Sequence, residues 1–342
     1  MRAPGLKDVA EAAGVHIATA SRALDARRAA MVKPETVDRV RRAAAELGYR
    51  VNRMARGLKM SRSFTIGMLV PDITNPFFPP IVRGAEDCLA EAGYTLVLGN
   101  TDNDQAKERR HLAGMLERQV DGFLLAMARR RDPLVEELKK GPAAVVLVNR
   151  TTDRGGVSSV IPDDQAGMRL AVEHLHGLGH RRIAHVAGPA DTSTGARRAA
   201  GFTSTMKALG LPGRRVVRAA AFAEAAGREA SRPLFDGRSG PTAIVAANDL
   251  IALGVIEAGE EAGIRCPEDF SVVGFNDMPF VDRFRPALTT VRIPEYQIGQ
   301  RSAQLLLSRI EQPTDGIETI LIAPEFVVRS STAAPVGAQG PD

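Results

Sequence analysis

Short apolar segments alternate with longer helical patterns along most of this 342-residue chain. Such alternation is typical of parallel sheets whose two faces are covered by helices. The apolar segments are Phe64–Val70, Thr95–Leu98, Gly122–Ala126, Ala143–Val148, Ile183–Ala187, Ala243–Ala247 and Ser271–Phe275. Seven or more strands split into two groups predict an α/β fold with two doubly wound lobes.

Composition excludes several classes of protein. The chain is 44% hydrophobic and 25% charged, as in ordinary globular proteins of two or three domains. Cys88 and Cys266 are too few for a disulfide framework and have no metal-ligand spacing, so we expect neither metal nor cofactor. No apolar run approaches the roughly 18 residues that span a bilayer, and Met1–Val9 lacks the order of a secretory signal. We therefore expect a cytoplasmic protein with no membrane partner.

Positive charge is concentrated at the N-terminus. Residues 1–60 hold 13 Lys and Arg against 6 Asp and Glu, a net charge of +7. The rest of the chain holds 32 against 34, a net charge of −2, so the whole excess lies in the first sixth. A basic segment on a near-neutral body favours contact with a phosphate backbone, although a solvated basic arm would have the same charge.

Residues 1–50 carry the pattern of three short helices. Leu6–Ala13 has an apolar face and is ended by Gly14, and a second helix from Ile17 to about Leu24 follows at once. The third begins at Pro34 and is closed by Gly48. Helix, glycine turn and helix at this spacing predict a helix-turn-helix.

The second helix presents side chains that suit the edges of DNA bases. With Ala20 and Leu24 turned inward, its first turn would enter the major groove. Arg22 can donate two hydrogen bonds to guanine, and the apolar Ile17 and Ala18 can contact thymine methyl groups. Side chains suited to phosphate oxygens, which position the head without reading sequence, are Thr19, Ser21 and Asn52.

Four segments combine into a recognisable pattern: Leu6–Leu24, Pro34–Val40, Glu46–Tyr49 and Ile66–Phe78. Together they closely resemble the lactose-repressor (LacI/GalR) family of bacterial transcription regulators, over about residues 5–330. The resemblance implies a helix-turn-helix head in residues 1–50, a hinge helix in 51–62 and a periplasmic-binding-protein-like body in 63–331. Residues 332–342, rich in Ala, Gly and Pro, are expected to be a disordered tail.

In that family the body has two lobes and the chain crosses between them three times. We expect crossings near residues 162, 290 and 322. One lobe would then hold residues 63–161 and 291–321, and the other residues 162–290 and 322–331. Ligands of such proteins bind in the cleft between lobes, at the carboxyl ends of the strands.

The hinge has a specific role in the family, where it folds only on operator DNA. Leu58 matches a leucine that wedges into the minor groove and kinks the duplex. The resemblance also adds Leu6, Ala55 and Arg56 to the predicted DNA-binding residues. His16 departs from the pattern, because the family usually has Ser as the cap of the recognition helix, so we expect a weaker or differently made cap. Lys33 likewise replaces a usual Ser.

The resemblance also implies a set of effector-binding residues. They are Asp72, Phe77, Phe78, Asn149, Ser193, Thr194, Arg198, Phe222, Asn248 and Asn276. Arg198 matches an arginine that grips ligand oxygens, and Phe222 matches an aromatic that stacks on the ligand. Asn149 and Asn276 stand where the family often has Asp, which removes negative charge opposite Arg198. We therefore expect a neutral or acidic ligand rather than a cationic one.

The sequence thus predicts a dimeric transcription regulator, a repressor more than an activator, with double-stranded operator DNA and a sugar-like effector as partners. A periplasmic-type sugar-binding protein is the main alternative, and it would leave the basic head unexplained. An enzyme on a doubly wound fold is the second. No nucleophile elbow or paired carboxylates stand out, so no catalytic residue is predicted.

Overall fold

The computed structural model describes residues 4–25, 28–49, 62–212, 215–236, 240–314 and 316–336. The chain divides into two compact units, Met1–Ser63 and Phe64–Asp342. Asn52, Ala55, Arg56 and Leu58 lie outside the described residues. Their DNA contacts, and the hinge that would carry them, stay predictions.

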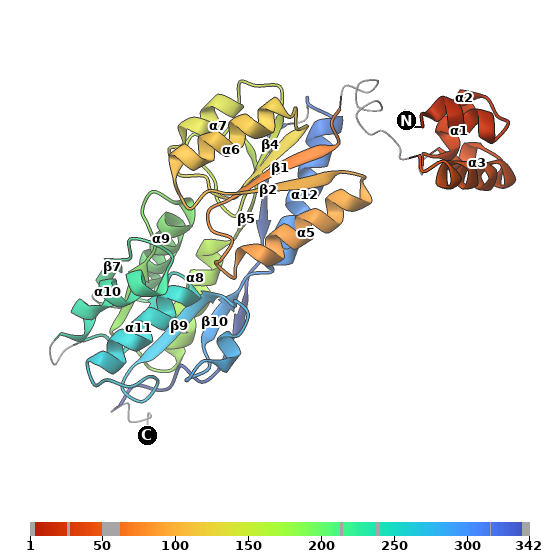
Figure 1. The fold of residues 1–342 in the computed structure, drawn as a ribbon. Coiled ribbons are helices and arrows are strands. Elements are labelled where there is room, and N and C mark those ends of the chain that lie inside the picture. Colours follow the sequence, from red (N-terminus) through yellow and green to blue (C-terminus); the bar gives the residue numbers. More distant parts are fainter. Residues whose placement is uncertain are drawn as a thin grey trace. The chain divides into compact units, whose positions relative to one another are not determined.

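The first unit contains the three predicted helices, labelled in Figure 1 as α1 (Leu6–Ala12), α2 (Ile17–Ala23) and α3 (Pro34–Glu46). A short 3-10 turn, η1 (Ala29–Met31), comes between α2 and α3. Gly14 has a φ of +62°, as the tight turn between α1 and α2 requires. Small and β-branched side chains fill the core of this unit: Val9, Ala10, Ala13, Ala20, Ala23, Val37, Val40, Ala43 and Ala44. Leu24, predicted inside, is only partly buried and packs against this core.

The first lobe of the second unit is built on a parallel sheet with strand order β11-β5-β4-β3-β1-β2. Its strands are β1 (Thr65–Val70), β2 (Thr95–Asn100), β3 (Gly122–Leu125), β4 (Ala144–Val148), β5 (Ser158–Pro162) and β11 (Thr319–Ile322). Side chains of β1 alternate between the two faces of the sheet. Ile66 and Met68 join one core cluster and Leu69 joins another, so both faces are covered.

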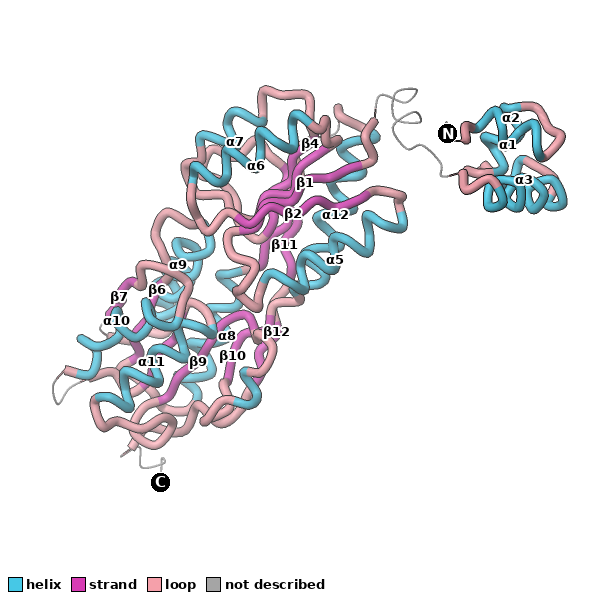
Figure 2. The backbone as a smooth tube through the Cα atoms, viewed as in Figure 1, coloured by secondary structure: helices cyan, strands magenta, loops and turns pink. Residues whose placement is uncertain are grey.

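The second lobe has a sheet with strand order β12-β10-β9-β8-β6-β7. Its strands are β6 (Ile183–Ala187), β7 (Arg215–Arg218), β8 (Ala243–Ala246), β9 (Ser271–Asn276), β10 (Thr289–Arg292) and β12 (Glu325–Val327). All neighbours run parallel except β10 and β12. Figure 2 shows the two sheets as separate sets of strands within one unit.

Helices cover both faces of each sheet (Figure 1). In the first lobe they are α5 (Phe78–Glu91), α6 (Gln105–Glu117), α7 (Pro133–Leu138) and α12 (Glu295–Glu311). In the second they are α8 (Asp164–Gly177), α9 (Ser193–Ala208), α10 (Glu224–Phe235) and α11 (Asp249–Glu261), with a 3-10 turn η2 (Val281–Arg283). This is the doubly wound arrangement that the alternating pattern predicts.

The chain passes between the lobes after β5, after β10 and after β11. Five strands, β5, β7, β10, β11 and β12, were absent from the apolar segments of the sequence. The predicted tail also begins later than residue 332, because the Thr332 hydroxyl lies 3.0 Å from His174 Nε2 and the Ala333 amide donates to Ser271 Oγ at 3.0 Å. These two residues are therefore tied to the second lobe.

Two glycines let α5 and α12 pack backbone to backbone. A Cβ on Gly84 would lie 2.1 Å from the carbonyl oxygen of Tyr296, and one on Gly299 would lie 1.9 Å from that of Ile81. Both contacts are far inside van der Waals distance and involve backbone atoms, which move only if the helices separate. Since α12 follows β10, this packing fixes where the chain returns to the first lobe.

We expect Gly299→Ala to lower the free energy of unfolding by about 1–3 kcal/mol, because overpacking forces backbone shifts. Gly177→Ala is the matched control, since a Cβ there meets nothing within 4 Å. It should change the stability by less than about 1 kcal/mol, in the stabilising direction. Urea unfolding of both variants measures this, and equal effects would contradict the close-packing argument.

Candidate functional site

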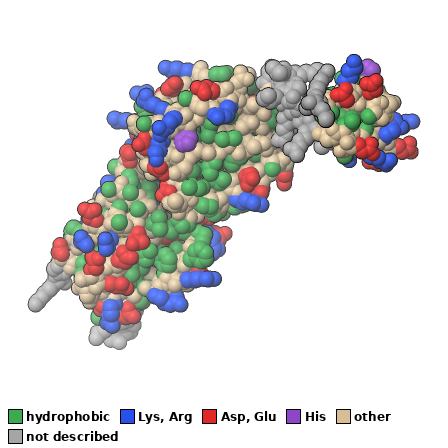
Figure 3. Space-filling view, viewed as in Figure 1, with side chains coloured by type: hydrophobic (Ala, Val, Ile, Leu, Met, Phe, Trp, Pro, Cys, Tyr) green, Lys and Arg blue, Asp and Glu red, His purple; other side chains and the backbone are tan. Residues whose placement is uncertain are grey.

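The head presents one face of α2 to solvent. Ile17 is 42% exposed, and Ser21 and Arg22 are exposed as well. Ala18 and Thr19 are partly buried, and Leu6 is partly buried against the core of the head. Figure 3 shows Lys and Arg side chains on the visible face of this unit, interspersed with Asp and Glu. The predicted base-reading side chains therefore lie together on one short helix.

His16 caps α2 in place of the family's serine. Its Nδ1 accepts a hydrogen bond from the amide of Ala18 at 3.2 Å. The cap is thus made differently, as expected, with an imidazole nitrogen satisfying one of the free amides of the first turn. Lys33 precedes α3 without a side-chain cap, and Pro34 at the first helical position has no amide to satisfy.

In the second unit, the lobes meet at the ends of their strands. The amide of Thr151, after β4, donates to Ser193 Oγ at the start of α9 at 2.9 Å. The amide of Arg130, after β3, donates to the carbonyl of Asp191 at 2.7 Å. We call the region where the lobes meet the interlobe junction. It is formed by the loops after β3, β4, β6, β7, β8 and β9. Ser193 and Thr194, two of the predicted effector-binding residues, are buried there, and their contact with a ligand stays a prediction.

Arg198 is buried and already engaged. Its Nε donates to Asp164 Oδ1 at 2.8 Å, and a terminal nitrogen donates to the carbonyl of Ala247 at 2.6 Å. The guanidinium carbon lies 3.8 Å from the centre of the Phe275 ring. Asp164, which the sequence reasoning missed, therefore balances the charge of Arg198 and fixes its orientation.

Asn149 follows β4, Asn276 is the last residue of β9, and both have a positive φ, of +62° and +118°. Asparagine adopts such conformations more readily than most residues, which gives it a local structural reason at both positions. Both side chains are buried, and neither Oδ1 has a hydrogen-bond partner among the described residues. Both oxygens thus remain acceptors at the interlobe junction.

The other predicted ligand residues have local roles. Asn248 Oδ1 caps α11 by accepting from the amide of Ile251 at 2.9 Å, and Asp72 Oδ1 accepts from Thr74 at 2.6 and 2.9 Å. Phe77 and Phe78 are 3% and 4% exposed and pack edge to face in the core of the first lobe. Phe222 is partly buried at the junction, where its ring leaves no room for a Cβ on Gly188.

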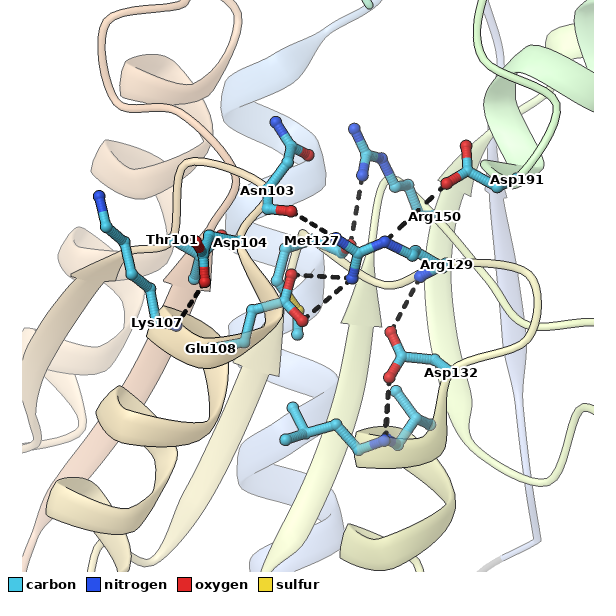
Figure 4. A network of polar contacts seen from close by, with 12 residues as sticks. Thr101, Asn103, Asp104, Lys107, Glu108, Met127, Arg129, Asp132, Arg150 and Asp191 are labelled. Carbon is cyan, nitrogen blue, oxygen red and sulfur yellow. Dashed lines mark hydrogen bonds and ion pairs between the residues drawn. The ribbon is translucent and has the colours of Figure 1, made fainter.

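Figure 4 shows a network at the edge of the first lobe that the sequence did not indicate. Arg129 holds both oxygens of the buried Glu108 at 2.9 and 3.0 Å and donates to the carbonyl of Asn103 at 2.6 Å. Its Nε lies 3.9 Å from Asp191 of the second lobe. Arg150 lies in the same network and donates to the carbonyl of Met127 at 3.3 Å. No motif marks these residues, because they meet only through the fold.

A surface pocket of about 370 Å³ borders this network and is lined by Arg130, Arg131, Asp132, Pro133, Glu136, Glu137, Lys140, Thr152 and Arg154. None of the predicted ligand residues lines it. In the part of the chain that is described, no helix is both long and apolar enough to cross a membrane. No cluster of three His, Cys, Asp or Glu side chains able to hold a metal ion occurs in those residues either.

Comparison with known proteins covers both units. Residues 5–52 match the model of bacterial regulatory proteins of the lacI family, and residues 172–332 match that of a periplasmic binding protein-like domain. The ribose operon repressor of Escherichia coli strain K12 is 33% identical over 330 residues, covering 95% of this chain and 99% of that protein.

Two solved structures extend the comparison to three dimensions. The lac repressor dimer bound to operator and the anti-inducer ONPF has a TM-score of 0.84 at 27% identity, covering 97% of this chain and all of that one. A complex of the transcriptional regulator CelR with cellobiose has a TM-score of 0.73 at 32% identity, covering 96% and 99%.

His185 lies in β6, and the positive charges of Arg198 and Arg218 act on its ring. Its Nδ1 lies 2.7 Å from the carbonyl of Val245 and therefore carries the proton, and its ring stacks on Phe202. Burial, which the hydrogen bond to Val245 opposes and the positive charges of the two arginines assist, lowers the pKa of His185 to about 4. The ring is neutral at physiological pH.

The burial of His185 predicts that the folded protein is less stable in acid. Because the folded pKa lies below the ordinary value of about 6.5, the unfolded chain binds more protons between these values, so stability falls as pH drops through this window. Between pH 7.5 and 5 the loss from this one group is on the order of 2 kcal/mol. His185→Asn, which cannot titrate, should show a correspondingly flatter dependence in urea unfolding. A variant curve parallel to the native one would rule out this origin.

Proposed function

The chain belongs to the LacI family of bacterial regulatory proteins, and on that premise we propose that it is a sequence-specific DNA-binding repressor of transcription. The observation that carries the proposal is the exposed face of α2, with Ile17, Ser21 and Arg22 outward, inside the segment that matches the family. A short helix that shows an arginine and apolar side chains to solvent suits the major groove.

Two copies are proposed to act together on a near-palindromic operator. The lac repressor structure that this chain resembles is a dimer bound to operator. Residues 1–50 would read the half-sites, residues 51–62 would form the hinge with Leu58 as its wedge, and residues 63–331 would sense the effector and form the dimer. A protein with these relatives would work in the cytoplasm, where its operator lies, and we assign no reaction to it.

A sugar or a related small metabolite is proposed as the effector. The related ribose operon repressor and the cellobiose complex of CelR support this class. A ligand at the interlobe junction would touch residues of both lobes, so its binding would depend on how the lobes are placed. It can shift that equilibrium only by its difference in affinity for the two arrangements.

The mode of DNA reading can be tested with one pair of variants. The operator is first selected from a pool of randomised duplexes with the full-length chain. Arg22→Ala should then weaken operator binding by about 1–3 kcal/mol and relax the preference at one base position. Arg39→Ala on α3 removes the same charge from another exposed site and is the control for phosphate attraction.

Mobility shifts on operator and on random DNA separate the two effects. The Arg39 variant should lose affinity for both DNAs to a similar extent, or for neither, because phosphate contacts carry no sequence information. If Arg22→Ala also lost equal affinity on both, Arg22 would be a phosphate contact and the assignment of its base would be wrong.

A further inference from the structure

The surface pocket of the first lobe is lined by none of the effector-binding residues predicted above. Its volume of about 370 Å³ lies within the range of sites for small molecules. Its walls come from three segments of one lobe, namely the loop after β3, the helix α7 and the loop after β4. Lys139 Nζ donates to the carbonyl of Gly155 at 3.1 Å, and this bond joins the end of α7 to the loop after β4.

Three cations of this lining have no acidic partner among the described residues. Arg131, Lys140 and Arg154 are exposed, and no carboxylate of those residues lies within 4 Å of their nitrogens. Arg130, the fourth cation, is paired, because its Nε donates to Asp153 Oδ1 at 2.9 Å. The positive charges of the other three are therefore free to meet an anion from solution.

Most of the carboxylates that line the pocket are already engaged. Asp132 accepts hydrogen bonds from three backbone amides, at 3.0 to 3.4 Å (Figure 4). Glu136 pairs with Lys139 at 3.3 Å. Glu137 is the one acid of the described lining without such a contact. The lining thus has three unpaired cations and one unpaired carboxylate, which leaves a surplus of positive charge.

A buried hydroxyl in the wall of the pocket also lacks a hydrogen bond. Thr152 is 7% exposed, and its Oγ1 has no partner among the described residues. An unpaired polar atom of this kind lowers the stability of the folded chain, and an oxygen of a bound molecule would satisfy it. The pocket therefore combines unpaired positive charge with a free hydroxyl donor.

We propose that this pocket binds a small anionic molecule that carries a phosphate or a carboxylate group. The unpaired cations hold the charged group, since guanidinium and ammonium donors form their strongest hydrogen bonds with such anions. The hydroxyl of Thr152 donates to a further oxygen of the same molecule. The site is separate from the effector site proposed at the interlobe junction, so both can be occupied at once.

Arg130 links this pocket to the second lobe. Its amide donates to the carbonyl of Asp191 at 2.7 Å, and one of its terminal nitrogens donates to the carbonyl of Ala190 at 3.3 Å. Both acceptors precede α9 of the second lobe. A molecule in the pocket touches a residue that joins the lobes, so its affinity depends on how the lobes are placed.

Thermal melting of the full-length chain tests whether the pocket binds an anion. The probes are inorganic phosphate, citrate and glucose 6-phosphate, each compared with sodium chloride at equal ionic strength, and glucose as the neutral control. They are used at low millimolar concentration, where the general stabilising effect of such salts is small. At least one anion should raise Tm above its chloride control. Comparison of the three then distinguishes a free phosphate, a carboxylate and a phosphate ester.

Variants assign the shift to the pocket. Replacing Arg131→Gln and Arg154→Gln together should lower the affinity for that anion by about tenfold or more, because two charge-assisted hydrogen bonds are lost. Thr152→Val should weaken binding too, yet leave Tm of the free chain unchanged or higher, since it removes an unsatisfied hydroxyl. Arg118→Gln is the matched control and should keep the full shift, because this exposed arginine of the same lobe does not line the pocket.

Labelling of arginines with phenylglyoxal locates the bound anion. It should protect Arg131 and Arg154 from modification and leave Arg118 reactive, as peptide mass spectrometry would show. The proposal is overturned if no anion shifts Tm or if the shift persists in the double variant. A shift lost in Phe222→Leu but kept in the double variant also overturns it, because the anion then binds at the interlobe junction. Operator binding is measured separately by mobility shift, and its absence would contradict the proposed function but not this site.

Discussion

The direction of the strands decides where this molecule can place polar side chains. Within each sheet nearly all neighbours run parallel, so the loops that follow them lie at the same edge. Helices cover both faces and fill them with apolar side chains, which leaves the carboxyl ends of the strands as the place for buried amides and charges. Asn149, Arg150, Asn276 and Arg198 all lie at or beside such ends.

Close packing of α5 against α12 also stabilises this arrangement. The chain leaves the first lobe after β5 and returns through α12, whose Gly299 meets the backbone of α5. A contact between backbones has little freedom to rearrange, so the return segment holds the first lobe as one body. Residues of α12 accordingly share a hydrophobic core with those of α5.

The sequence was sufficient for the parts of the fold that have a local signal. Apolar runs predicted the central strands, and the glycine turn predicted the helix-turn-helix. It did not indicate β5, although all its residues are buried, because the strand begins with two serines. Ser159 Oγ lies 3.1 Å from the hydroxyl of Thr319, and Ser158 Oγ accepts from the amide of Glu318. Hydrogen-bond partners 160 residues away allow the serines of this strand to be buried, and the periodicity of a sequence cannot reveal such distant partners.

The candidate site, too, has parts that the sequence could indicate and parts that only the fold shows. Resemblance to a family identified Arg198 and the residues around it, but nothing in the sequence shows that Asp164 pairs with Arg198 while Arg150 has no such partner. Both arginines are buried in one junction, so composition and position would treat them alike. The difference arises from the fold, in which Glu108 pairs with Arg129 and Asp164 pairs with Arg198. An arginine with a fixed counter-ion contributes orientation and shape, because its charge is already balanced. Arg150 has no such counter-ion among the described residues, and this difference between two buried arginines becomes visible only in the fold.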